Sequence, residues 1–422
     1  MTFEDRLERV LTLAETLPRY KADLMRLAAR NLKFTFKDTA YEVDLTVDRL
    51  KLFDQTEIFL GRRKPRGGPG STVAVMLSYN GSAWLNTVIT SVYIVGNKVL
   101  AKFASRGQDL MALTRDIYEP IFGRDITFYR GDGKSFMRDS LNNPDISTVI
   151  VFGFDSNMLP YEEDFRRTGK KFVFEGPGVD PFIVLPDADL EKALADLMQA
   201  KFSYSGQTCS APKRIFVHRR IYEEFLEQFV DRVRKLKVGA PEDPETDISA
   251  VASELAVSRI KTQIKDAVAK KAKVLIGGEI EGSLVYPTVI RDATDDMAGM
   301  CEEVFGPVAF TSPFEAVPEV IARAQNHKYG LRAAVFGGAE AKEIARALRG
   351  ESYCHPVPDY TFGKFGTVAV NKPRAETWIG SLVTKAVGGY GYSGWIWETV
   401  DGRFRLKQGP KLLSLESSVP MD

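Results

Sequence analysis

The hydrophobic pattern of the chain changes its period near residue 72. Before that point apolar side chains recur every three or four positions, which predicts amphipathic helices; the first two apolar stripes are Leu7, Val10, Leu11 and Ala14, then Tyr20, Leu24, Leu27 and Ala28. After it, short runs rich in β-branched and aromatic residues alternate with helical stretches; these runs are 72–79, 97–104, 125–131, 147–154, 170–176 and 180–186. The alternation predicts an α/β fold in which helices cover a parallel sheet.

Two helices near the middle of the chain carry recognisable end signals. Asp187 and Asp189 are candidate N-terminal caps for a helix over 187–202. A second helix is expected over 222–238, because Gly239 provides a good C-terminal stop. Between these two helices a short strand, rich in basic and apolar side chains, is predicted over 214–218.

The length of 422 residues allows roughly two or three domains. A stretch rich in Gly, Pro and Arg at 61–71 interrupts the early pattern. A second α/β pattern, from about 257 to 370, reads as a separate domain.

Charge and cysteine content exclude several classes of function. Lys and Arg number 57 against 56 Asp and Glu, a net charge of +1, so bulk charge would attract neither nucleic acid nor an anionic membrane. No apolar run reaches the length of a membrane span, and the N-terminus has no signal-peptide pattern. Cys209, Cys301 and Cys354 form no metal-binding spacing, so we expect no metal and a reducing, cytoplasmic location.

Two glycine-rich stretches match nucleotide-binding patterns only superficially. The sequence 389–394 has the GxGxxG spacing, but no helix pattern follows it and it lies outside any βαβ unit. The stretch 131–135 lacks the earlier glycine of a phosphate-binding loop, because position 128 is Phe. Neither stretch predicts a phosphate site.

Cys209 lies in a polar run, "YSGQTCSAPKRIFV", between an apolar helix and a basic strand. Free cysteine is usually a small buried apolar residue. The small and polar neighbours on both sides of Cys209 are instead typical of a reactive thiol. From the residues alone, both interpretations stay open.

Three segments in order along the chain resemble the aldehyde dehydrogenase superfamily. The segment 206–218, "GQTCSAPKRIFVH", resembles the family's active-site signature, and 301–310, "CEEVFGPVAF", resembles its EEIFGPV segment. The segment 172–194 resembles the stretch that carries the family's glutamate. Weaker matches cover nearly all the rest, although the chain starts later than a typical member; they are 74–84, 96–105, 366–371 and 388–394.

This resemblance implies a domain plan. A Rossmann-type NAD(P)-binding domain would comprise 1–54 and 71–177, an α/β catalytic domain 178–395, and a small bridging or oligomerisation element 55–70 and 403–418. Residues 411–416 resemble the terminal strand through which family members pair, so a homodimer or homotetramer is expected.

The resemblance also implies the chemistry, namely NAD(P)-dependent oxidation of an aldehyde to a carboxylic acid. Cys209 would attack the aldehyde, and the Asn80 side-chain amide and the Cys209 N–H would stabilise the oxyanion. Glu175 would activate the water that releases the acid. Without the resemblance, Glu175 reads as a solvated carboxylate at a strand end.

Four further residues are expected to bind the cofactor. By resemblance, Lys102 holds the adenine-side ribose, Glu303 grips the nicotinamide ribose and Phe305 packs beside it. Their alternatives are an ordinary surface lysine and an ordinary loop charge. Ser105 stands where many NAD-preferring relatives have Glu, so NADP is expected to be accepted at least as well as NAD, with Arg106 as a second cation near the phosphate or a side chain in solvent.

The sequence departs from the family pattern at both catalytic loops. Residues 78–82 lack the prolines that usually flank the asparagine, and 176–179 read GPGV instead of LGGK. These altered loops keep a catalytically silent member of the fold open as an alternative. A CoA-acylating relative also stays open, although such relatives tend to lack the glutamate and Glu175 counts against it. Lys372 and Arg374 lie where the family's substrate-entrance loop falls, so the aldehyde is expected to be anionic unless both are merely solvated charges.

Overall fold

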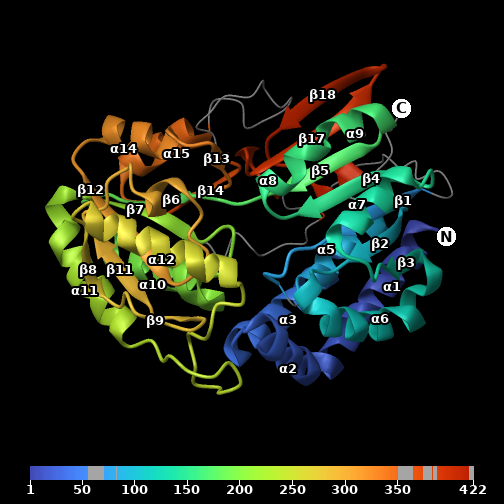
Figure 1. Cartoon of the computed structure of the whole chain (residues 1–422), viewed down its shortest axis with the longest axis horizontal. Coiled ribbons are helices and arrows are strands. Elements are labelled where there is room, and N and C mark those ends of the chain that lie inside the picture. Colours follow the sequence, from blue (N-terminus) through green and yellow to red (C-terminus); the bar gives the residue numbers. More distant parts are fainter. Residues whose placement is uncertain (56–70, 82, 350–364, 374–382, 384–386, 418–422) are drawn as a thin grey trace.

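A computed structural model describes residues 1–55, 71–81, 83–349, 365–373, 383 and 387–417. Its described strands form two seven-stranded sheets in two lobes, together with two small two-stranded pairs (Figure 1). The chain crosses from the first sheet to the second between Glu175 and Asp180. The residues at this crossing therefore lie where the two lobes meet.

The first sheet has the strand order β18-β17-β5-β4-β1-β2-β3. Its strands from β1 to β5 are parallel, and β17 is antiparallel to both β5 and β18. The bounds are β1 Thr72–Met76, β2 Lys98–Lys102, β3 Ile126–Phe128, β4 Ile146–Phe152, β5 Lys171–Glu175, β17 Gly394–Val400 and β18 Arg403–Gln408.

Helices cover this sheet with the apolar stripes found in the sequence. Figure 1 shows α1, α2 and α3 beside α6, and α1 packs against α3, α5 and α6. Side chains cap two of these helices, since Thr2 accepts from Asp5 N and Thr35 accepts from Asp38 N. The bounds are α1 Phe3–Thr16, α2 Lys21–Leu32, α3 Phe36–Lys51, α5 Leu85–Ile94, α6 Gln108–Phe122, α7 Gly133–Asn142, α8 Asp155–Met158, α9 Glu162–Thr168 and α16 Leu413–Ser417.

The second sheet has the order β15-β14-β6-β7-β12-β11-β8, and only β8 is antiparallel to its neighbour. Its strands are β6 Asp180–Val184, β7 Pro212–His218, β8 Lys273–Ile276, β11 Thr288–Arg291, β12 Val308–Phe314, β14 Arg332–Phe336 and β15 Thr367–Val370. The two small pairs join β9 Ile280–Glu281 to β10 Leu284–Val285 and β13 Tyr329–Gly330 to β16 Tyr390–Gly391.

Helices also cover the second sheet, and its buried β-branched runs form the core beneath them. The helices are α10 Leu190–Phe202, α11 Tyr222–Arg234, α12 Glu254–Ala269, α13 Ala298–Cys301, α14 Val317–Gln325 and α15 Ala339–Arg349. Short 3₁₀ turns, η1 to η7, join several elements; they are Leu17–Tyr20, Leu52–Gln55, Ser105–Gly107, Gly123–Asp125, Leu159–Tyr161, Ser203–Gly206 and Arg219–Ile221.

The expected α/β architecture is confirmed, as are the six strands expected over 72–186 and the strand expected between the two central helices, which is β7. Asp189 caps α10 by accepting from Lys192 N, as the sequence predicts. The predicted helix over 222–238 is too long, because α11 ends at Arg234 and Val238 pairs with Ile248 in a β-bridge.

The C-terminal segment differs from its expected form. The prediction of a terminal pairing strand at 411–416 is wrong, since Lys411 makes a single bridge to Val387 and the following residues form α16. Leu413 is buried and α16 packs on α5, so this segment serves the chain's own core. Strands β17 and β18 extend the first sheet, while the domain boundaries stay a prediction and 56–70 lie outside the described residues.

The described residues contain neither a helix suited to span a membrane nor a cluster of metal-ligating side chains. No helix there combines the length and the apolar character that crossing a membrane requires. The same residues include no group of three or more His, Cys, Asp and Glu side chains suited to a metal ion.

Candidate active site

One cavity of about 510 Å³ contains all seven residues that the sequence singled out. Its lining includes the first residues of β14 and β15 in the second sheet; in the first sheet, it includes the last residues of β2 and β5 and two more residues just after β1 and β2. In parallel α/β sheets ligands bind at these carboxyl ends. The seven residues are Asn80, Lys102, Ser105, Glu175, Cys209, Glu303 and Phe305.

The loop that carries Cys209 begins with a left-handed turn. Tyr204, Ser205 and Gly206 have φ of 55°, 52° and 73°, a region that costs free energy for residues other than glycine. At Gly206 a side chain would collide with the backbone, because a Cβ there would lie 2.2 Å from Gly306 O. The turn is anchored from a distance, since Ala252 N donates to Gln207 Oε1 at 2.8 Å.

Lys213 holds the backbone on the other side of Cys209. Its Nζ donates to Thr208 O at 2.9 Å and to Cys209 O at 2.7 Å, and its side chain is fully buried. The sequence analysis missed this residue, although a lysine four positions after the cysteine was visible there. Lys213 therefore orients the peptide groups on both sides of the Cys209 Cα.

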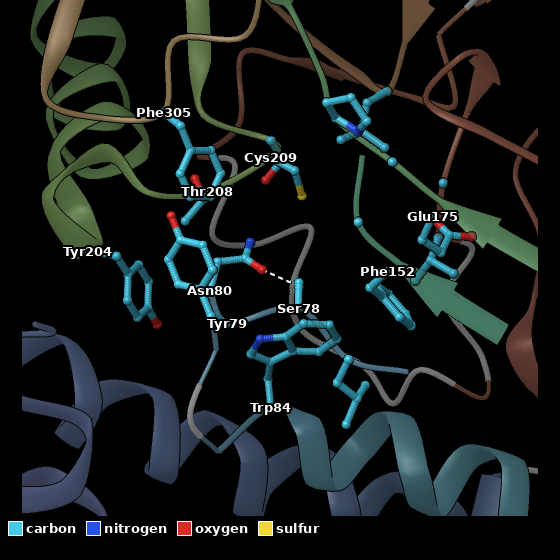
Figure 2. A pocket seen from close by; sticks show the side chains of 18 of the residues that line it. Ser78, Tyr79, Asn80, Trp84, Phe152, Glu175, Tyr204, Thr208, Cys209 and Phe305 are labelled. Atoms are coloured by element: carbon cyan, nitrogen blue, oxygen red, sulfur yellow. Dashed lines mark hydrogen bonds between the residues drawn. The ribbon is translucent and has the colours of Figure 1, made fainter. Parts of the chain in front are cut away.

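Cys209 is a thiol rather than a thiolate in this resting arrangement. Burial raises its pKa to about 11, the negative charge of Glu303 adds to the rise, and Lys213 opposes it. The side chain is still partly accessible from the cavity, where Figure 2 shows its sulfur. This access disfavours the interpretation of Cys209 as an ordinary apolar residue and favours that of a thiol presented to a ligand site.

Asn80 is oriented by its own loop. Ser78 Oγ donates a hydrogen bond to Asn80 Oδ1, drawn as a dashed line in Figure 2. Because the amide oxygen accepts this bond, the Nδ2 group remains as the donor. Figure 2 shows this nitrogen turned to the side on which Cys209 lies.

Glu175 is buried, so its interpretation as a solvated carboxylate is wrong. Only 6% of its side chain is exposed, and its Oε1 lies 3.1 Å from Lys411 Nζ in an ion pair. Burial raises the pKa of Glu175, and Lys411 opposes that rise. In Figure 2 the carboxylate lies away from the Cys209 sulfur, and Phe152 lies on the side of Glu175 that is nearer to Cys209.

The expected cofactor residues also belong to the lining of the cavity. Lys102 is 2% exposed, so it is not an ordinary surface lysine, and its Nζ donates to Phe103 O at 2.9 Å. Ser105 is exposed at the start of η3. Arg106 donates to Ala252 O and lies 5.6 Å from the Tyr79 ring centre, so its guanidinium is already engaged.

Glu303 and Phe305 reach the cavity from the segment before β12. Burial raises the pKa of Glu303 to about 7, while Lys213, 4.0 Å away, opposes the rise. The ring of Phe305 packs edge-on against that of Tyr79 at 5.9 Å. This contact connects the loop after β1 to the second lobe.

Comparison with known proteins shows to which family the chain belongs. The model of the aldehyde dehydrogenase family matches residues 1–396. The chain belongs to the aldehyde dehydrogenase family. The site residues thus lie in a chain whose family was expected from its sequence motifs.

Individual relatives agree with this family. The chain is 40% identical over 181 residues to the sulfoacetaldehyde dehydrogenase of Neptuniibacter caesariensis, covering 42% of this chain and 40% of the relative. It is 35% identical over 228 residues to a probable NADP(+) succinate-semialdehyde dehydrogenase of Sinorhizobium fredii, covering 53% and 46%. An aldehyde dehydrogenase from Bacillus cereus, solved as its NAD+ complex, matches with a TM-score of 0.84 and 25% identity, covering 99% and 83%. The matched stretches span less than half of both curated relatives.

Homologues in the aldehyde dehydrogenase family use NAD or NADP, and the cavity has polar groups that fit such a dinucleotide. Glu303 Oε1 is buried and has no hydrogen-bond partner among the described residues. Lys102 Nζ carries three donors, and the bond to Phe103 O occupies one of them. A buried acceptor and a buried cation are suited to ribose hydroxyls.

Proposed function

We propose that this chain oxidises an aldehyde to a carboxylic acid with NAD or NADP. The observation that carries the proposal is the presence of Cys209, Asn80 and Glu175 in the lining of one cavity. These side chains supply a nucleophile, an amide donor and a carboxylate, the three groups that acyl transfer through a thioester requires.

In the proposed mechanism Cys209 Sγ attacks the carbonyl carbon and its proton leaves to water or a base. The carbonyl oxygen becomes an oxyanion, to which Asn80 Nδ2 and the Cys209 N–H donate. Loss of a hydride from the carbon of this adduct, for which the nicotinamide of the bound cofactor would be the acceptor, lets the oxyanion collapse to a carbonyl and leaves a thioester on Cys209. Glu175 then takes a proton from the water that attacks the thioester carbon, the C–S bond breaks and the acid leaves.

The substrate class is proposed to be an anionic aldehyde. The two curated relatives named above act, by their names, on aldehydes that carry a sulfonate or a carboxylate. Lys372 is exposed after β15, where a cation could attract such a group. Arg374, the other cation expected from the sequence, lies outside the described residues.

The proposal is tested by following NAD(P)H absorbance with a panel of aldehydes and with each cofactor. Neutral and anionic aldehydes of matched length separate general activity from the proposed substrate class. Equal kcat/KM for the two sets would reject the anionic class while leaving the oxidation intact. Formation of an acyl-CoA in the presence of CoA would favour the acylating alternative, which the presence of Glu175 disfavours.

The catalytically silent alternative has its own readout. A thiol reagent should modify Cys209, and NAD(P)+ should change the rate of that reaction. A Cys209 that is inert under all conditions, together with no turnover of any aldehyde, would support the silent member. A homodimer or homotetramer in a cytoplasmic location completes the proposal, and sedimentation of the purified chain tests the assembly.

A further inference from the structure

A buried lysine contacts the carboxylate of the proposed general base. Lys411 Nζ lies 3.1 Å from Glu175 Oε1, and the two side chains are 2% and 6% exposed. Neither of these two atoms has a hydrogen-bond partner among the described residues, so the contact is an ion pair. Nothing in the local sequence around either residue indicates this pairing.

The backbone around the pair leaves room for it. Lys411 exchanges backbone hydrogen bonds with Val387, which brings its side chain next to Gly388 and Gly394. A Cβ at Gly388 would lie 2.5 Å from both Glu175 Oε2 and Lys411 Nζ, and one at Gly394 would lie 2.6 Å from that nitrogen. Two glycines therefore make the space in which the ion pair forms.

The ion pair offsets the free-energy cost of burying the carboxylate of the proposed general base. A carboxylate buried at the end of β5 is destabilised by desolvation, and an adjacent cation offsets this. The negative charge of Glu416 acts against ionisation of Glu175. Glu416 is itself paired with Lys171 on β5 and with Lys407 on β18, and Lys171 also reaches Glu398 on β17. Lys411 is the cation in direct contact with Glu175 among the described residues.

We propose that Lys411 is a positioning residue that keeps the buried Glu175 carboxylate ionised and ready to take a proton during deacylation. The inference rests on the proposed function, because it assumes that Glu175 is the base. Without the ammonium, Glu175 would hold its proton to higher pH and could not accept the proton of the attacking water. The acylation step at Cys209 needs no contribution from Lys411.

The test compares Lys411→Met with Lys237→Met, which also removes a lysine charge, from an ion pair with Glu245 whose two residues lie outside the cavity lining. Lys411→Met should keep the initial burst of one NAD(P)H per site, lower the steady-state kcat by about tenfold or more near neutral pH, and move the acid limb of kcat upward by about one to three pH units. Lys411→Arg should restore part of the rate. Lys237→Met should leave both properties close to those of the parent.

The outcomes separate this inference from the proposed function. If Glu175→Gln turns over like the parent, Glu175 is not the base and the mechanism of the proposed function fails. If Glu175→Gln stalls after its burst but Lys411→Met keeps the parent's pH profile, only the role of Lys411 is overturned. A faster turnover in Lys411→Met would also overturn it. Should Lys411→Met fail to fold, Lys411→Gln gives the same comparison with a neutral donor.

Discussion

Ser78 Oγ donates a hydrogen bond to Asn80 Oδ1, two residues further along the loop after β1. In the family pattern this loop is stiffened by prolines, which are missing here. The hydroxyl supplies a different constraint, because it holds the amide by its oxygen and leaves its nitrogen toward the side of Cys209. Orientation of a donor before reaction is what makes an oxyanion site effective.

Removal of that hydroxyl should impair catalysis without changing the fold. Ser78→Ala should lower kcat/KM for a good aldehyde by about tenfold, since the amide would rotate among several orientations. Ser78→Thr should retain most of the rate. Ser71→Ala is a matched control, because Ser71 bonds Ser147 and lies outside the cavity lining. A Ser78→Ala enzyme as fast as the parent would show that the loop needs no such bond.

Cys209 should be the only cysteine that oxidation of the aldehyde requires. Cys209→Ala should abolish NAD(P)H formation, because no other group in the proposed mechanism can form the thioester. Cys301→Ala should remain active, since the Cys301 thiol bonds Asp295 O and lies outside the cavity lining. Steady-state assays of the two variants at equal enzyme concentrations test this prediction. An active Cys209→Ala variant and an inactive Cys301→Ala variant would overturn the assignment.

The charge of Glu303 should control the reactivity of the Cys209 thiol. Glu303 raises the pKa of Cys209 and has a pKa of about 7 itself, so raising the pH past 7 creates a negative charge that opposes thiolate formation. Glu303→Gln should therefore accelerate alkylation of Cys209 by iodoacetamide, by about tenfold for each pKa unit removed. Peptide mapping by mass spectrometry isolates the Cys209 rate from that of Cys301.

A second variant, Lys213→Gln, is expected to change the rate of Cys209 alkylation in the opposite direction. Lys213 lowers the pKa of Cys209, so Lys213→Gln should slow the same alkylation. Slower labelling in both variants would point to a disturbed loop instead of an electrostatic effect.

Cofactor preference should depend on Ser105. In Ser105→Glu a carboxylate would repel the 2′-phosphate of NADP and accept a hydrogen bond from the ribose 2′-hydroxyl of NAD, so the kcat/KM ratio should shift toward NAD by about tenfold or more. Gln108→Glu adds the same charge on α6 outside the cavity lining and should have little effect. A parent enzyme with a strong preference for NAD would contradict the expectation that NADP is accepted at least as well as NAD.

The sequence predicted those parts of the fold that depend on local patterns. Buried strands such as β4 and β5 are continuous apolar runs, and Asp189 is a strong cap, so both were recognisable. Motifs then identified residues such as Cys209 and Glu175, which the fold brings into one cavity. In contrast, the end of α11 at Arg234 and the bridge between Val238 and Ile248 were not predicted, because no helix-stop rule contains such a bridge.

The contacts that surround the catalytic groups could not be predicted from the sequence. The ion pair between Glu175 and Lys411 depends on the pairing of β17 with β5, which joins residues far apart in the chain. Likewise, the role of Lys213 depends on how the backbone turns at 208–209. Such contacts are set by tertiary packing and leave no periodic signal in the sequence.

The burial of Cys209 has a consequence for chemical durability. Peroxides and other oxidants attack thiolates far faster than thiols, and a thiol with a pKa of about 11 is almost entirely protonated at neutral pH. The protein therefore carries the proposed nucleophile in a form that resists conversion to sulfenic and sulfinic acids. The same burial that disfavours the thiolate protects Cys209 from irreversible oxidative damage.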